Sequence, residues 1–100
     1  MTNGYKILWT DHALGELKAT LDFLEAYWTD KELRNLALEL EKTLRLISQN
    51  PFLFQSSDFR KGIRRVVVAK LNTMYYRINA DSIEILSFFT NRQNPQKRKV

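Results

Sequence analysis

Cysteine is absent from this 100-residue chain, and histidine and glycine are scarce. Without cysteine the chain can form no disulfide bond, no thiolate zinc site and no cysteine nucleophile. The one histidine, His12, has no second histidine or thiol with which to hold a metal ion, so we interpret it as structural or solvent-facing. The glycines Gly4, Gly15 and Gly62 are too far apart to form a phosphate-binding loop. We therefore expect no metal ion and no cofactor.

Long apolar runs are also missing. A membrane helix needs roughly 20 consecutive apolar residues, and Asp11, Glu16 and Lys18 interrupt the first part of the chain, which therefore lacks a signal-peptide pattern too. With 44% hydrophobic and 27% charged residues, the composition is typical of a globular protein. We expect one cytoplasmic domain over residues 1–100, with a basic tail at about 91–100.

Acidic residues are missing from one long segment, Arg60 to Ala80. This segment carries six basic residues, namely Arg60, Lys61, Arg64, Arg65, Lys70 and Arg77. Residues 1–59 contain six Lys or Arg and nine Asp or Glu, a net charge of −3, whereas residues 60–100 contain ten and two, a net charge of +8. The asymmetry indicates a polyanionic partner, either nucleic acid or an acidic protein segment.

The basic half of the chain also contains the predicted sheet. β-Branched and aromatic residues predict three strands, Ile63–Leu71, Thr73–Asn79 and Ser82–Thr90. Their short connections make neighbouring strands antiparallel, as in a meander. A fourth strand is predicted at Tyr5–Thr10, and the meander is the sheet that it can join.

Two amphipathic helices are predicted between the first strand and the meander. The first spans about 12–28, with Thr10 or Asp11 as its N-cap, and its apolar stripe consists of Leu14, Leu17, Leu21, Leu24 and Trp28. The second follows the capping-box pattern of Thr29 and Glu32 and ends before Pro51. Its predicted stripe consists of Leu33, Leu36, Ala37, Leu40, Leu44 and Ile47.

These elements predict an α+β fold. Neither helix can bury its stripe alone, so we expect an antiparallel helical hairpin that covers one face of a four-stranded, mostly antiparallel sheet. Three phenylalanines, Phe52, Phe54 and Phe59, lie between the hairpin and the meander. They are interpreted either as part of the core edge or as an apolar surface for a partner.

Alternation along the strands places the side chains on two faces. Met74, Tyr76 and Ile78 share one face of the middle strand, and Thr73, Tyr75, Arg77 and Asn79 share the other. Arg64 and Arg65 point to opposite faces, so one of them lies against the apolar layer with its guanidinium group at an edge. The sequence leaves open which one does so.

We predict a groove that binds phosphates and stacks a base. Its expected lining is Arg64 or Arg65, with Tyr75, Arg77 and Arg92, and Arg60, Lys61 and Lys70 add positive potential. The alternative is ordinary surface pairing of these arginines with acids such as Asp81 and Glu84.

The ordered set of motifs resembles the RelE/ParE superfamily of toxins, also called the plasmid stabilisation family. The resemblance covers roughly residues 5–95. It consists of the element order, the Asn50-Pro51 break, Gly62-Ile63-Arg64-Arg65, Tyr75-Tyr76-Arg77-Ile78, Ile83-Glu84-Ile85-Leu86 and Asn91-Arg92-Gln93-Asn94-Pro95. It implies the toxin of a bacterial type II toxin–antitoxin module, which arrests growth in the cytoplasm. The implied partner is a cognate antitoxin, through which the toxin reaches operator DNA only indirectly.

The resemblance leaves two targets open. ParE-like members inhibit DNA gyrase by binding, whereas RelE-like members cut mRNA on the ribosome. RNA cleavage needs a proton acceptor, a donor for the leaving oxygen and cations at the phosphate. The candidate catalytic residues are Arg65, Arg77 and Tyr75, with Tyr76 as another possible base. Where many nucleases of the family have a His or Tyr, this chain has Phe88, Phe89 and Thr90. We therefore favour the ParE-like toxin, and keep the endonuclease and a non-toxic degenerate module as alternatives.

Overall fold

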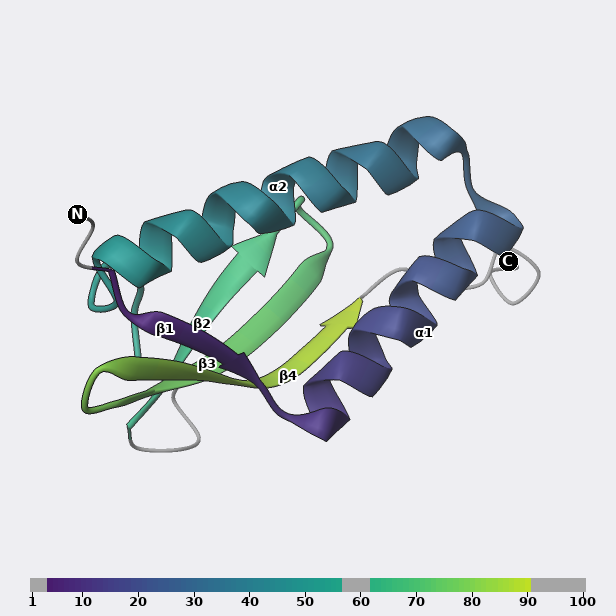
Figure 1. Ribbon diagram of the computed structural model, residues 1–100. Coiled ribbons are helices and arrows are strands. Elements are labelled where there is room, and N and C mark those ends of the chain that lie inside the picture. Colours follow the sequence, from purple (N-terminus) through teal and green to yellow (C-terminus); the bar gives the residue numbers. More distant parts are fainter. Residues whose placement is uncertain (1–3, 57–61, 91–100) are drawn as a thin grey trace.

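The computed structural model describes residues 4–56 and 62–90. A strand, two helices and three strands follow one another along the chain (Figure 1). Their bounds are β1 Lys6–Trp9, α1 Asp11–Tyr27, α2 Asp30–Gln49, β2 Ile63–Val68, β3 Asn72–Asn79 and β4 Ser82–Thr90. The predicted α+β class and the predicted order of elements are confirmed.

The four strands form one mixed sheet in the order β1–β4–β3–β2. β2, β3 and β4 form the antiparallel meander, and β1 joins it parallel to β4. β1 pairs only with residues 82–85, the first half of β4. The prediction of a mostly antiparallel sheet is confirmed, and the second half of β4 has no strand on that side among the described residues.

The predicted strand Ile63–Leu71 was too long at its C-terminal end. β2 stops at Val68 because Ala69 and Lys70 have positive φ angles, 51° and 71°. The loop between the paired residues Val68 and Asn72 has three residues, and positive φ in such loops is usually found at Gly or Asn. The Ala-Lys pair carries no such signal, so the turn could not be recognised from the residues.

Side-chain caps fix the start of both helices. The hydroxyl of Thr10 accepts a hydrogen bond from the amide of Ala13 (3.1 Å), and that of Thr29 accepts one from the amide of Glu32 (3.2 Å). α2 ends at Gln49 because Pro51 disfavours helical geometry in the residue before it. These predicted boundaries are confirmed. In the described part of the chain, neither helix is long and apolar enough to cross a membrane.

α1 turns a somewhat different face to the sheet than its leucines predict. Ala13, Thr20 and Leu24 are buried, whereas Leu14 is 47% exposed. α1 packs directly on β4, and the small side chains of Ala13 and Thr20 allow that close contact. Leu14 lies about 100° further round the helix than Ala13 and so points away from the sheet.

α2 follows its predicted stripe more closely. Leu36 and Ile47 are fully buried, and Leu33, Leu40 and Leu44 are partly buried against the core. Ala37 is exposed, contrary to the prediction, because it lies about 100° round the helix from Leu36. Two hydrogen bonds, 2.7 and 2.8 Å long, join Ser48 near the C-terminal end of α2 to Tyr5, the residue before β1.

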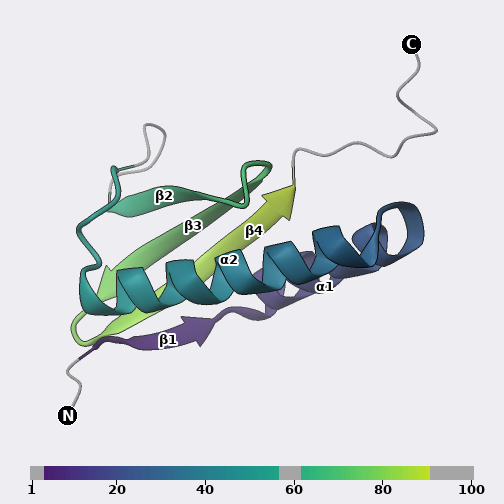
Figure 2. The same cartoon turned by 90° about the horizontal axis from the view of Figure 1, so that it is seen from above.

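Both helices lie on one side of the sheet, and the core fills the space between them (Figure 1). Figure 2 shows that the tip of the hairpin, where α1 meets α2, extends past the ends of the strands. The buried hydrophobic residues of the sheet are Val66, Val68, Met74, Tyr76, Ile83, Ile85 and Phe88. The other side of the sheet is covered by no element among the described residues and is called the open face below.

Tyr76 is the largest fully buried side chain of this core. Its hydroxyl donates a hydrogen bond to the carbonyl oxygen of Pro51 (2.7 Å) and so ties β3 to the segment after α2. Burial raises the pKa of Tyr76 to about 12, and the nearby Arg64 opposes this in part. Tyr76 is therefore neutral and structural, and the sequence-based suggestion of Tyr76 as a base was wrong.

We expect the substitution Tyr76→Phe to lower the free energy of unfolding by about 2 kcal/mol, because it leaves the buried Pro51 carbonyl without its donor. Urea unfolding followed by circular dichroism measures this. The matched control is Tyr27→Phe, which removes a hydroxyl from a side chain that is 42% exposed and should change stability by less than about 0.5 kcal/mol. Equal effects of the two substitutions would contradict this role of Tyr76.

Stability should also depend on alkaline pH through Tyr76. Its pKa is about 12 in the folded protein and 10.0 as the ordinary value, so the unfolded chain ionises first as the pH rises. The stabilisation is therefore complete below pH 10 and is lost progressively toward pH 12. Urea unfolding across this range should show a steeper loss for the wild type than for Tyr76→Phe, and parallel curves would contradict the burial argument.

Candidate functional site on the open face of the sheet

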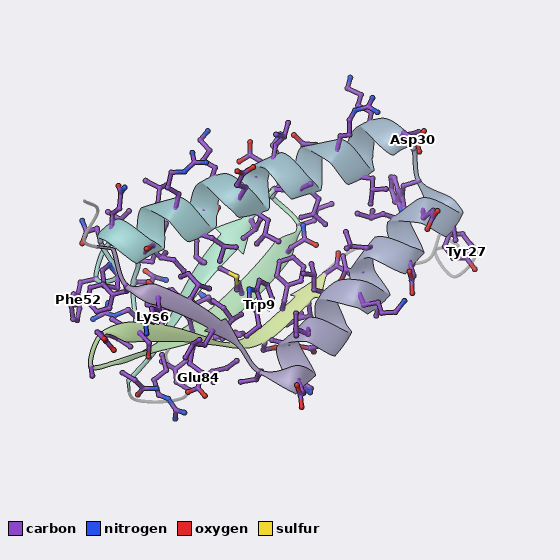
Figure 3. The ribbon with its side chains drawn as sticks, in the orientation of Figure 1. Lys6, Trp9, Tyr27, Asp30, Phe52 and Glu84 are labelled. Atoms are coloured by element: carbon purple, nitrogen blue, oxygen red, sulfur yellow. The ribbon has the colours of Figure 1, made fainter. Side chains whose placement is uncertain are left out.

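The strand registers bring residues from three strands together on the open face. Arg65 of β2 lies opposite Tyr75 of β3, and Arg77 of β3 lies opposite Glu84 of β4. Figure 3 shows Glu84 on the side of the sheet away from α2, whereas Trp9 lies on the helix side. The predicted separation of Met74, Tyr76 and Ile78 from Thr73, Tyr75, Arg77 and Asn79 is thus confirmed.

The structure decides between the two adjacent arginines. Arg64 lies on the helix side of β2, where its Nη1 donates to the carbonyl oxygen of Phe54 (2.6 Å). Its guanidinium carbon lies 5.0 Å from the centre of the Phe52 ring, within cation–π distance. Arg64 therefore connects β2 to the segment after α2. Arg65 is the arginine that lies on the open face. Phe52 is 61% exposed and contacts Arg64, whereas Phe54 packs against the core.

Arg77 is engaged by an acid on its own face. Its Nη2 lies 2.6 Å from Oε1 of Glu84, and the side-chain amide of Asn79 donates to the same oxygen (3.2 Å). The hydrogen bond from Arg77 is the main reason why the pKa of Glu84 is lowered below its usual value. Glu84 is consequently a stable anion and a weak base, and Arg77 contributes little net charge.

Two aromatic rings stack on the open face. The ring centroids of Tyr75 and Phe89 are 6.0 Å apart and their planes differ by 21°, a stacked arrangement. Phe89 is 37% exposed, and Val67 on the neighbouring strand is 57% exposed. The two rings belong to β3 and β4, the central strands of the sheet, and they lie toward the C-terminal end of β4. This part of the open face is therefore apolar.

Phe89 was not among the residues predicted for this site. Strict alternation from Ile83 and Ile85 would place Phe89 in the core and Phe88 outside it. A register shift between β3 and β4 reverses this, because Tyr75 pairs with Ser87 whereas Tyr76 pairs with Ile85. A β-bulge of this kind moves the following side chains to the opposite faces. The adjacent pair of phenylalanines was the available signal, since one of them must face outward.

Glu16 of α1 holds the part of β4 that β1 does not cover. Its Oε1 accepts hydrogen bonds from the amide of Phe88 (2.9 Å) and the hydroxyl of Ser87 (2.8 Å). His12 lies one helical turn away, with its Nε2 3.3 Å from the same oxygen. The contact fixes the end of the strand that carries Phe89, and no local pattern in the sequence indicates it.

Lys70, another predicted basic residue, is not brought into this cluster. Lys70 lies in the β2–β3 turn, beside a groove of about 760 Å³ lined by Glu32, Asn35, Glu39, Val67, Ala69, Lys70 and Leu71. Arg60, Lys61 and Arg92, together with Phe59, lie outside the described residues. Within the described ranges no group of three His, Asp or Glu side chains is placed to hold a metal ion.

Solved structures with a similar fold include the following three. A chain of the chromosomal ParDE toxin–antitoxin system from P. aeruginosa has a TM-score of 0.72 and 14% identity, over 91% of this chain and 100% of its own. The YoeB/ParE toxin from Agrobacterium tumefaciens has a TM-score of 0.59 and 15% identity, over 87% and 99%. A conserved hypothetical protein from Helicobacter pylori has a TM-score of 0.59 and 16% identity, over 86% and 93%. No protein-family model and no curated protein matches the sequence.

The chain has a RelE/ParE-like fold. This confirms the fold expected from the ordered motifs and from the periodicity of the helices and strands. In this RelE/ParE fold the open face is formed by all three strands of the meander. At 14–16% identity the likeness establishes the architecture, and function has to be argued from the residues of the site.

The two adjacent arginines should differ in their effect on stability. Arg64→Gln should lower the free energy of unfolding by about 1.5 kcal/mol, because a charged hydrogen bond and a cation–π contact are lost. Arg65→Gln is the matched control and should change it by less than about 0.5 kcal/mol, because Arg65 is exposed. Urea unfolding measures both, and a larger loss for Arg65→Gln would contradict the assignment of faces.

Proposed function

We propose that this chain is the toxin of a bacterial type II toxin–antitoxin module. It acts in the cytoplasm, arrests growth by binding a cellular target such as DNA gyrase, and is neutralised by a cognate antitoxin protein. The proposal is supported by the RelE/ParE fold and by the ParDE toxin–antitoxin system to which one of the similar structures belongs. Operator DNA is reached only through the antitoxin.

The pairing of Glu84 with Arg77 favours binding over RNA cleavage, and it is the observation that supports the ParE-like assignment. Cleavage through the 2′-hydroxyl needs a proton acceptor. The hydrogen bond from Arg77 lowers the pKa of Glu84 and makes its carboxylate a weaker acceptor. Tyr76, one of the two tyrosines suggested as a base, is buried on the opposite face. A toxin that acts by binding needs no such group.

A RelE-like endonuclease is the second candidate, because Arg65, Tyr75 and Arg77 lie next to one another on the open face. Arg65 and Arg77 would neutralise the phosphate, and Tyr75 would serve as the acid or base. Binding and cleavage are different activities of the same fold, so the experiment has to separate them.

Induced expression in a bacterial cell that lacks the antitoxin tests the proposal. We expect growth arrest, and we expect co-expression of the protein encoded beside this one to restore growth. Unchanged growth on induction, with the folded protein detected in the cells, would contradict the proposal and leave the non-toxic degenerate module.

Two assays with purified protein then distinguish the targets. The wild type should inhibit supercoiling by DNA gyrase and should leave ribosome-bound mRNA intact. The control variant for cleavage is Arg77→Ala. Cutting of mRNA by the wild type that Arg77→Ala abolishes would contradict the ParE-like assignment and support the endonuclease.

A further inference from the structure

We propose that the open face is the surface that binds the target protein, and that its ligand is a polypeptide segment in which a carboxylate stands beside an apolar side chain. Arg65 binds the carboxylate, and the stacked rings of Tyr75 and Phe89 contact the apolar side chain. This inference rests on the proposed function and adds to it the surface and the chemistry of the partner.

The apolar half of the proposed surface is central and accessible. Tyr75 and Phe89 lie on the two central strands, and Phe89 and Val67 are 37% and 57% exposed. Protein interfaces are typically built around aromatic side chains near their centre, with Tyr and Arg over-represented among the residues that carry the binding energy. The two helices pack on the other face, where they cover the core residues, so the open face is the more accessible one for a partner.

The charge of this surface is concentrated on one arginine. Arg65 is exposed and lies directly across from Tyr75, and it makes no ion pair with any acid in the described ranges. Arg77 is already neutralised by Glu84 at 2.6 Å. A guanidinium group binds a single carboxylate well, through two parallel hydrogen bonds. The described surface thus complements one carboxylate next to an apolar contact.

A nucleic-acid strand fits this arrangement less well. Its phosphates recur regularly and require a row of cations, whereas Lys6, the remaining basic residue on the described part of this face, lies on the opposite edge strand from Arg65. Arg77 lies on a strand between them but is already paired with Glu84. Tyr75 and Phe89 also stack on each other, which occupies ring surface that a base would need. These three observations favour a polypeptide.

The test compares the toxicity of variants in cells, where the target need not be known in advance. Arg65→Glu and Phe89→Ser remove the two halves of the surface, and Arg65→Gln shows whether charge reversal is worse than neutralisation. The matched controls are Arg34→Glu and Leu38→Ser, which make the same kinds of change at exposed positions of α2. Urea unfolding of each purified variant confirms that it is folded.

We expect Arg65→Glu and Phe89→Ser to raise the intracellular level needed for growth arrest by about tenfold or more, the size typical of changing a central interface residue. Arg65→Gln should fall between Arg65→Glu and the wild type, and both controls should match the wild type. The same ranking is expected for inhibition of purified DNA gyrase if gyrase is the target.

Four results would overturn the inference. Folded variants that remain as toxic as the wild type exclude the open face as the target surface, although the proposed function survives. Variants that remain toxic but escape the antitoxin assign the face to the antitoxin instead. RNA binding or cleavage by the wild type that the variants lose assigns it to nucleic acid. A wild type that does not arrest growth removes the proposed function itself, and this inference with it.

Discussion

The structure depends on the one-sided packing of two amphipathic helices against a four-stranded sheet. Strand side chains alternate in direction, so covering one face divides each strand into a buried set and an exposed set. On β3 this places Met74 and Tyr76 in the core and leaves Tyr75 and Arg77 outside. The chemistry of the open face is therefore a consequence of where the helices bury their apolar surface.

Three features that depend on residues from other elements then determine which side chains the open face displays. The β-bulge after Ile85 turns Phe89 outward and Phe88 inward, and Glu16 holds the end of β4 by accepting the amide hydrogen of Phe88. On β2, Arg64 donates a hydrogen bond to the Phe54 carbonyl on the helix side. Arg65 is therefore the arginine of the open face that has no acid partner among the described residues. In the described ranges, a basic sequence thus yields an open face with an apolar patch and one guanidinium group that is not paired with an acid.

Local patterns in the sequence were sufficient for the fold. The caps at Thr10 and Thr29 and the alternation along β3 all depend on neighbours within a few residues, and they predicted the elements correctly. The bulge in β4, the choice between Arg64 and Arg65 and the contact of Glu16 with β4 depend on residues far away in the chain. No short motif encodes them, so the composition of the open face could be predicted only in part.

Three consecutive valines in β2 provide the most direct test of the division into two faces. Relaxation enhancement of methyl signals by a soluble gadolinium complex measures the access of solvent to each side chain. We predict strong enhancement for Val67, which is 57% exposed, and weak enhancement for Val66 and Val68, which are 5% and 1% exposed. Similar enhancement of all three, or protection of Val67 alone, would contradict the one-sided packing on which the account depends.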